Sequence, residues 1–307
     1  VSTTDIMMKS PNQLIKTFIL LAAAMVFTLT LLVQANINMQ KDDSFSLDDT
    51  YALASDGTVH LSTEDAEVLV RGENRDDVRV QITYRRTVKG IDTGSLSSFD
   101  VDVEERGGDL FIRDTKGSRN GISIGVISET YKIVITAPKS ASLEMDGDDD
   151  EYSINGINGA IEIDADDADI IVADTKSNML DFEIEDGDIK LNGGTGSVII
   201  MSEDSDINIQ NGTFQKVDIE IEDGDIRFSN AYDDKGSYRF MVEDGTLELF
   251  VTGGGGKFII RHDDASFDTT KEFQLVERTE RRTRYDLPGG SARIVIDIED
   301  GRVELRR

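Results

Sequence analysis

Carboxylate side chains recur along this sequence within one short phrase: an acidic residue, an aspartate, a small residue, a second acidic residue and an apolar residue. Numbered from the aspartate as position 0, the acidic positions are −1, 0 and +2. The aspartates are Asp149, Asp167, Asp186, Asp204, Asp223, Asp244, Asp264 and Asp300, with an outlying copy at Asp65. The first seven are 18 to 21 residues apart, and Asp300 follows after 36 residues, or two periods. This regular spacing predicts that carboxylates of successive copies lie side by side.

Carboxylates arranged in this way, with neighbouring backbone carbonyls, are the oxygen ligands that Ca²⁺ prefers. Three central copies are acidic at all three positions and supply the candidate metal-binding residues. These are Glu185, Asp186, Asp188, Glu203, Asp204, Asp206, Glu222, Asp223 and Asp225. On stacked strands about 4.8 Å apart, like charges repel by roughly 0.9 kcal/mol in water. The ladder predicts either specific Ca²⁺ sites or diffuse screening by cations. A third interpretation is that Asp and Gly are simply what a type I′ turn requires.

Residue types that most catalytic sites need are scarce. The absence of cysteine and the presence of only two histidines argue against disulfides, thiol catalysis and a closed zinc site. The string Arg261-His262-Asp263-Asp264 has the most catalytic composition, but His262 stands at position −2, where other copies have Ile or Val, so a packed histidine is favoured. His60 has no evident partner. We therefore predict no catalytic residue and no cofactor apart from Ca²⁺.

The net charge of −29, from 61 acidic and 32 basic residues, restricts the partners. A nucleic acid is not expected, because binding phosphates requires clustered Lys and Arg. The remaining candidates are a surface protein, a glycan or a second copy of the chain.

Apolar residues around each aspartate show which elements carry the ladder. They fall at positions −6, −4, −2, +3 and +5. Around Asp186 these are Leu180, Phe182, Ile184, Ile189 and Leu191. A period of two predicts strands with one buried face, and the change of phase across the Asp-Gly pair predicts a tight turn there. Units too short to bury their own faces stack, so we predict an all-β, β-solenoid (β-helix-like) fold with coils of about 18–21 residues. An up-and-down sheet of hairpins is the alternative.

The chain divides into three parts. Residues 1–35 carry Lys9 and Lys16 ahead of the apolar run Thr17–Val33, which is typical of a signal peptide with a hydrophobic helix, or of an uncleaved anchor if the run stays in a membrane. Residues 36–140 form a less regular β segment leading into the solenoid. Residues 141–307 hold the regular repeats, with an Arg-rich hairpin near 273–288 whose arginines are expected to lie against acidic neighbours.

Three stretches resemble the adhesin-like families of exported bacterial β-repeat proteins, including the head-GIN type. They are the lead-in TYKIVITAPKSASLEMDG (130–147), SINGINGAIEID (153–164) and the recurring Gly-Asp-Ile at 187–189 and 224–226. The resemblance implies a secreted or envelope-located β-solenoid and carries over no catalytic residue. Here the phrase reads Glu-Asp-Gly-Asp-Ile where the families more often have Ser-Gly-Asp-Ile, which adds two carboxylates per coil.

Together these features predict a non-enzymatic exported protein in the periplasm, on the cell surface or outside the cell. Its expected role is adhesive or structural, with binding through the repeat faces. The alternative is a Ca²⁺-dependent envelope or matrix component that uses the stacked Asp/Glu turns. A polysaccharide-active enzyme is the remote alternative.

Overall fold

The computed structural model describes residues 40–92, 99–115 and 123–307, and every regular element in those ranges is a β-strand. The predicted all-β class is confirmed. The predicted signal segment lies outside the described residues. Within the described ranges no helix is long and apolar enough to cross a membrane.

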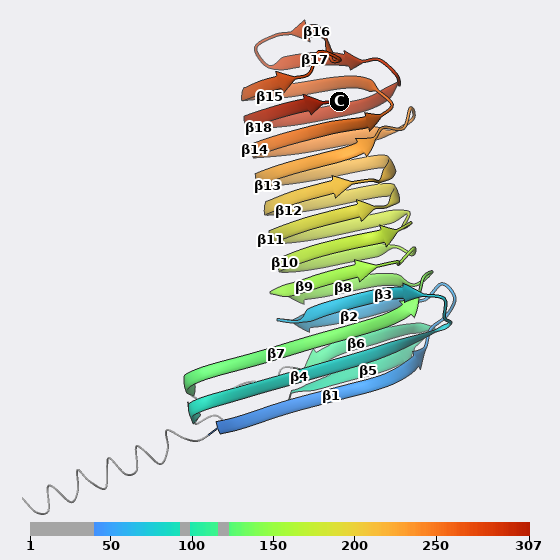
Figure 1. The fold of residues 1–307 in the computed structure, drawn as a ribbon, viewed down its shortest axis with the longest axis vertical. Coiled ribbons are helices and arrows are strands. Elements are labelled where there is room, and N and C mark those ends of the chain that lie inside the picture. Colours follow the sequence, from blue (N-terminus) through green and yellow to red (C-terminus); the bar gives the residue numbers. More distant parts are fainter. Residues whose placement is uncertain (1–39, 93–98, 116–122) are drawn as a thin grey trace, which may run out of the picture. The chain divides into compact units, whose positions relative to one another are not determined.

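Five long strands form the regular part of a β-solenoid (Figure 1). They are β10 (Ile161–Thr175), β11 (Met179–Gly193), β12 (Thr195–Gln210), β13 (Thr213–Ala231) and β14 (Ser237–Gly253). Each pairs in parallel with the next, and Leu180, for example, aligns with Ile161 on one side and Val198 on the other. The solenoid-like stack, with equivalent positions in register, is confirmed for these repeats. The alternative of a sheet of hairpins does not apply to them.

Each long strand continues through position 0 without interruption, and in β11, β13 and β14 the bend falls at the Asp-Gly pair. The predicted tight turn is therefore wrong for these coils. Positions −1 and 0 are both exposed, as at Glu185 and Asp186, and this pair shifts the buried face from even to odd positions. Gly187 and Gly224 have φ values of 130° and 126° at the bend. A Cβ on Gly187 would lie 2.2 Å from the carbonyl oxygen of Ala168 in the coil below. Glycine is therefore needed for the close approach of two backbones as well as for its φ.

The C-terminal coils do not stack in chain order. Strand β18 (Ala292–Arg306) lies between β14 and β15 (Gly256–Thr269) and pairs in parallel with both. Asp300 thus aligns with Asp244 on one side and Asp264 on the other. Strands β16 (Gln274–Arg278) and β17 (Arg282–Leu287) form an antiparallel hairpin, and β17 pairs antiparallel with β15. The parallel stack therefore ends at a short hairpin rather than at an open strand of full length.

Chain order is also broken near the N-terminal end of the stack. Strands β2 (Thr58–Glu64) and β3 (Glu67–Glu73) pair in parallel with β8 (Ser142–Asp148) and β9 (Asp150–Asn155). On the other side they pair with β6 (Asp109–Thr115) and β7 (Ser123–Pro138), and β5 (Asp100–Arg106) is antiparallel to β6. Glu64 aligns with Asp148, so the outlying copy of the phrase at Asp65 belongs to the same ladder as the others.

The remaining strands are β1 (Gln40–Ala52) and β4 (Asp77–Asp92), and β4 pairs with both β1 and β7. The chain forms two compact units: unit 1 comprises Val1–Ser44, Arg85–Ser98 and Gly117–Glu129, and unit 2 comprises Phe45–Tyr84, Phe99–Lys116 and Thr130–Arg307. The boundaries predicted near residues 35 and 140 stay a prediction.

The core of unit 2 consists of columns of like side chains along the stack. Position −4 contributes a column of fully buried side chains: Ile163, Phe182, Ile200, Ile219, Phe240, Ile296 and Ile260. Asn230, near the end of β13, is also buried, and its amide donates to the carbonyl of Ile209 at 2.9 Å and accepts from the N–H of Gly212 at 2.6 Å. Burial of these columns supplies the main stabilisation and fixes the outward direction of positions −1 and 0.

Candidate functional site

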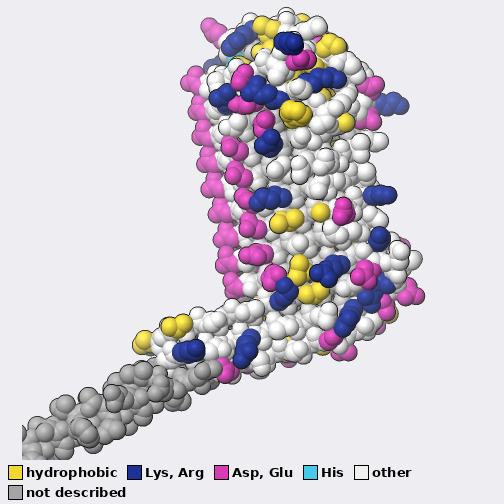
Figure 2. All heavy atoms as spheres, viewed as in Figure 1, with side chains coloured by type: hydrophobic (Ala, Val, Ile, Leu, Met, Phe, Trp, Pro, Cys, Tyr) yellow, Lys and Arg dark blue, Asp and Glu magenta, His cyan; other side chains and the backbone are white. Residues whose placement is uncertain are grey.

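The carboxylates at position −1 form a column along one edge of the stacked coils, where Figure 2 shows a continuous line of acidic side chains. The pKa of Glu185 is raised above its ordinary value, first by the charges of Asp166 and Glu203 on the coils below and above. Glu222 and Glu299 raise the pKa of Glu243 in the same way. The direction of both shifts indicates like-charge repulsion between carboxylates on successive coils.

The carboxylates at position 0 form a second column beside the first. Asp186 aligns with Asp167 below and Asp204 above. The same alignment continues through Asp223 and Asp244. These side chains are exposed. The structure thus brings the sequence-predicted residues together as rows that run across the coils.

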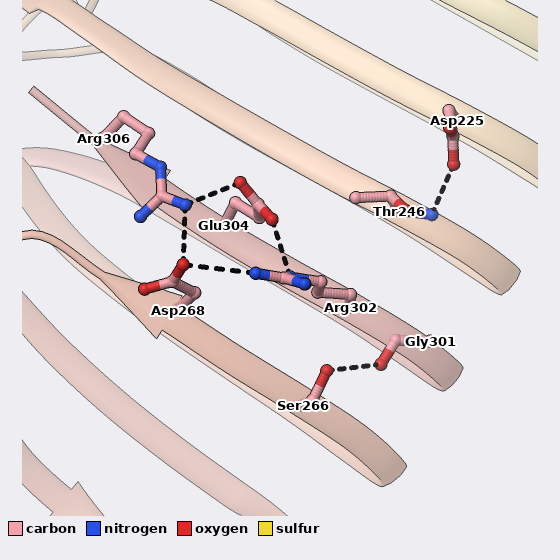
Figure 3. A network of polar contacts seen from close by, with 8 residues as sticks. All are labelled: Asp225, Thr246, Ser266, Asp268, Gly301, Arg302, Glu304 and Arg306. Carbon is pink, nitrogen blue, oxygen red and sulfur yellow. Dashed lines mark hydrogen bonds and ion pairs between the residues drawn. The ribbon is translucent and has the colours of Figure 1, made fainter.

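The aspartates at position +2 have a structural role that the sequence reasoning missed. Three of them accept a hydrogen bond from the backbone N–H of the +2 residue on the next coil. Asp169 accepts from Asp188 at 3.0 Å, and Asp206 accepts from Asp225 at 3.1 Å. Asp225 in turn accepts from Thr246 at 2.8 Å (Figure 3). One oxygen of each of these carboxylates is occupied, which explains the aspartate at +2 without a metal ion.

A shallow groove runs beside the −1 column across strands β10 to β13. Its walls are the outward residues at positions −3 and −1, and we call it the acidic groove. Its acidic residues are Asp164, Asp166, Glu183, Glu185, Glu203, Glu220 and Glu222. The lining is completed by Ala165, Ile184, Met201 and Ser202. Among the described residues, no Lys or Arg forms an ion pair with Glu185, Glu203 or Glu222.

The predicted Ca²⁺ ligands do not form a coordination site of their own in the described part of the chain. No group of three or more His, Cys, Asp or Glu side chains in residues 40–92, 99–115 and 123–307 is placed to hold a metal ion. Rows 4.8 Å apart spread the charge along the stack instead of directing several oxygens to one point. Whether the ladder takes up cations stays a prediction.

Basic side chains lie at the C-terminal coils. Arg239 pairs with Asp218 at 3.2 Å, and Arg261 pairs with Asp297 at 2.9 Å. In Figure 3, Asp268 contacts both Arg302 and Arg306. The hydrogen bond from Arg306, more than any other interaction, lowers the pKa of Asp268. Arg239 also lies 3.5 Å from Glu220, the one residue of the acidic groove with an ion pair in the described part of the chain. The other carboxylates of the groove are left unbalanced, while those at this end of the stack are paired.

The arginines of the β16–β17 hairpin also lie near acidic residues. Arg281 is 3.7 Å from Asp263, and Arg284 lies between Glu277 and Asp286. For Arg281 and Arg284, these contacts agree with the expectation that the arginines of this hairpin lie against acidic neighbours.

Both histidines have structural partners. His262 is half-buried, and its Nε2 lies 3.0 Å from the Thr283 hydroxyl. The ring of His60 stacks on Phe111 with centroids 4.3 Å apart, and its Nδ1 lies 3.1 Å from Glu144. The expectation that His60 lacks a partner was wrong, because both partners come from strands brought in by the unpredicted stacking order of β2, β6 and β8.

Comparison with known proteins gives a family match. The model of the family described as "Toastrack DUF4097" matches residues 58–306. No curated protein matches the chain.

Similar solved structures include a "putative cell adhesion protein" from Clostridium sporogenes (9% identity, TM-score 0.30, covering 87% of this chain and 99% of that chain). A "putative adhesin" from Parabacteroides distasonis has 12% identity and a TM-score of 0.33, covering 88% and 98%. Another from Parabacteroides merdae has 10% identity and a TM-score of 0.27, covering 87% and 96%. The resemblance to adhesin-like β-repeat families is confirmed, but likenesses this distant carry no argument about binding.

Proposed function

Since the chain belongs to the Toastrack DUF4097 family, we propose that it is a non-enzymatic, exported adhesive module that binds a partner through its acidic groove. The observation that carries the proposal is the row of carboxylates at positions −3 and −1 along four successive coils. Among the described residues, only Glu220 of this row has an ion pair, with Arg239 at 3.5 Å. A partner with regularly spaced positive charges, such as a Lys-rich surface protein or an amine-bearing glycan, has the chemistry to fit it.

The stacked geometry supports binding by many weak contacts. A single exposed ion pair contributes little, typically up to about 1 kcal/mol. The groove presents at least seven carboxylates in two rows, so an extended cationic partner can engage several at once. Binding would also relieve the repulsion that raises the pKa of Glu185.

The test uses the full chain and two cationic probes, poly-lysine and chitosan. The groove variant carries E185Q, E203Q and E222Q. The control variant carries E73Q, E104Q and E280Q, which remove the same charge from exposed positions outside the groove. We expect roughly tenfold weaker binding for the groove variant and little change for the control, since several charge contacts are lost only in the first. Binding is measured by biolayer interferometry. If both variants bind the probes equally weakly, the effect is due to net charge alone and the proposal is contradicted.

A second candidate is a cation-dependent envelope or matrix component, in which Ca²⁺ bridges the ladder to another chain or to anionic glycans. Its support is the close stacking of carboxylates along the −1 column, where the charge of Glu222 on the neighbouring coil is the first cause of the raised pKa of Glu243. Under this candidate, self-association measured by light scattering requires Ca²⁺ and reverses with chelator. Indifference to chelation, or an equal effect of Mg²⁺ and NaCl at matched ionic strength, would remove it.

Polysaccharide cleavage is not proposed. The Nε2 of His262, the sequence's strongest candidate base, is hydrogen-bonded with the Thr283 hydroxyl at 3.0 Å.

A further inference from the structure

Three large apolar side chains are exposed together at the start of β7. Ile124, Val126 and Ile127 have 63%, 68% and 47% of their surface exposed. The other exposed large apolar residues of the described chain occur singly or as the pair Leu275 and Val276. Contiguous exposed apolar side chains mark an interaction surface more often than scattered ones.

The same end of unit 1 holds the start of β1. Thr87 on β4 donates to Asp42 on β1 at 2.8 Å, and Arg86 lies 3.5 Å from Glu129 on β7. With strands about 4.8 Å apart, the first residues of β1 lie about 10 Å from the first residues of β7. The close backbone approach of Gly90 to Gly125 places the end of β4 at the same point. Figure 1 shows β1, β4 and β7 side by side.

The chain outside the described residues leads directly to this end. The apolar run Thr17–Val33 stops seven residues before Gln40, where β1 begins. Seven residues span at most about 25 Å. If the run is held in a bilayer, the exposed apolar side chains of β7 are kept within reach of its surface.

The charge of unit 1 suits the same surface. Its described residues, 40–44, 85–92 and 123–129, contain four basic and four acidic side chains, so their net charge is zero in a chain of −29. The basic residues are Lys41, Arg85, Arg86 and Lys89. This part of the protein is therefore not repelled by anionic headgroups, as the acidic ladder would be.

We propose that this end of unit 1 rests on a lipid bilayer, with Ile124, Val126 and Ile127 inserted at the headgroup boundary. Partial burial of apolar side chains in the interfacial region supplies the attraction, and Lys89 and Arg85 supply contacts to lipid phosphates. The proposal is independent of the acidic groove and of the adhesive role.

The absence of tryptophan from the chain gives a direct test, because a single introduced tryptophan is the only one in the protein. Full-length V126W is mixed with vesicles of phosphatidylethanolamine and phosphatidylglycerol that contain brominated lipid. L275W, at a position 54% exposed in unit 2, is the matched control. We expect brominated lipid to quench the emission of V126W by about half or more and to leave L275W nearly unchanged.

Adding I124S and I127S to V126W separates insertion from mere tethering by the N-terminal run. Loss of the two neighbouring apolar side chains is expected to reduce the quenching at least about threefold. The proposal is overturned if V126W floats with vesicles unquenched, if the added serines leave the quenching intact, or if L275W is quenched equally. A blue shift of V126W without lipid that grows with protein concentration would assign the patch to a second copy instead.

Discussion

At the scale of single residues, buried polar side chains hold the turns between coils in place. Asn230 is only 1% exposed, and both ends of its amide are used by backbone groups near the end of β12. Gly212 and Ile209 are themselves buried, so their backbone groups are shielded from solvent. Removing the amide would leave two buried groups unpaired, which costs more than the bonds themselves contribute.

We therefore expect N230A to lower the free energy of unfolding by about 3 kcal/mol. N208A, at a half-buried outward position on β12, is the matched control and is expected to cost less than about 0.5 kcal/mol. Urea denaturation of the full chain measures both. Similar midpoints for the two variants would show that the buried amide is replaceable.

The +2 aspartates show what residue-level pattern reading could and could not provide. The sequence located the carboxylates and their spacing correctly. It assigned Asp188, Asp206 and Asp225 to a cation site because carboxylates are oxygen ligands. In the structure Asp206 and Asp225 accept backbone N–H groups of the next coil, and Lys190 contacts Asp188 at 2.6 Å. The sequence alone does not show whether a carboxylate accepts a hydrogen bond from a backbone N–H of another coil or binds a metal ion.

At the scale of elements, each long strand depends on the residue at its bend. Gly245 has a φ of 145°, and a Cβ there would lie 1.8 Å from the carbonyl oxygen of Gly224 on the coil below. Gly107, between β5 and β6, also has a positive φ, 70°, but a Cβ there meets nothing within 4 Å. A comparison of substitutions at Gly107 and Gly245 therefore distinguishes the effect of a positive φ from the effect of close packing between coils.

G107A is expected to destabilise the protein by about 1 kcal/mol through its φ alone, whereas G245A costs about 3 kcal/mol or more because two coils must also move apart. Thermal unfolding followed by circular dichroism compares them. Equal shifts in Tm would mean that the bend needs glycine only for its φ.

The order of the coils shows the limit of prediction at this scale. Apolar positions at −6, −4, −2, +3 and +5 were sufficient to predict parallel, in-register coils, because one slip would turn the buried face outward. The same pattern does not say which coil stacks on which, because every coil presents the same buried positions to its neighbours. The sequence of Ala292–Arg306 alone does not predict that β18 lies between β14 and β15, since its buried residues repeat the pattern of both strands. The partners of His60 could not be predicted for the same reason.

At the scale of the whole molecule, repulsion between the many carboxylates lowers the stability of the folded protein. The size of this destabilisation depends on pH. Groups whose pKa is raised in the folded state bind protons more tightly when folded, so they favour folding at low pH. Their contribution is lost as pH rises through the folded pKa. Glu185 and Glu243 are such groups, because of neighbouring carboxylates. Asp150 is another, since burial raises its pKa to about 6 although the N–H of Ala66 donates to it.

Asp48 and Asp268 act in the opposite sense. The pKa of each is lowered, first by a hydrogen bond from arginine, so their contribution is lost as pH falls through the folded pKa, below the ordinary 3.8. Between about pH 5 and pH 8, the pH dependence of stability is therefore set by the carboxyl groups whose pKa is raised in the folded state. In that range, proton uptake relieves repulsion before the arginine pairs are broken.

We expect the Tm of the full chain to be several degrees higher at about pH 5 than at about pH 8 in low salt. About 0.5 M NaCl shortens the Debye length and should raise the Tm at pH 8 more than at pH 5, because the exposed column is screened and Asp150 is not. D150N keeps an acceptor for the N–H of Ala66 and should remove the part of the pH dependence that salt leaves. Differential scanning calorimetry at the four conditions checks both effects. A Tm that falls on acidification to pH 5, or that ignores salt at pH 8, would show that the column is already neutralised in the folded protein.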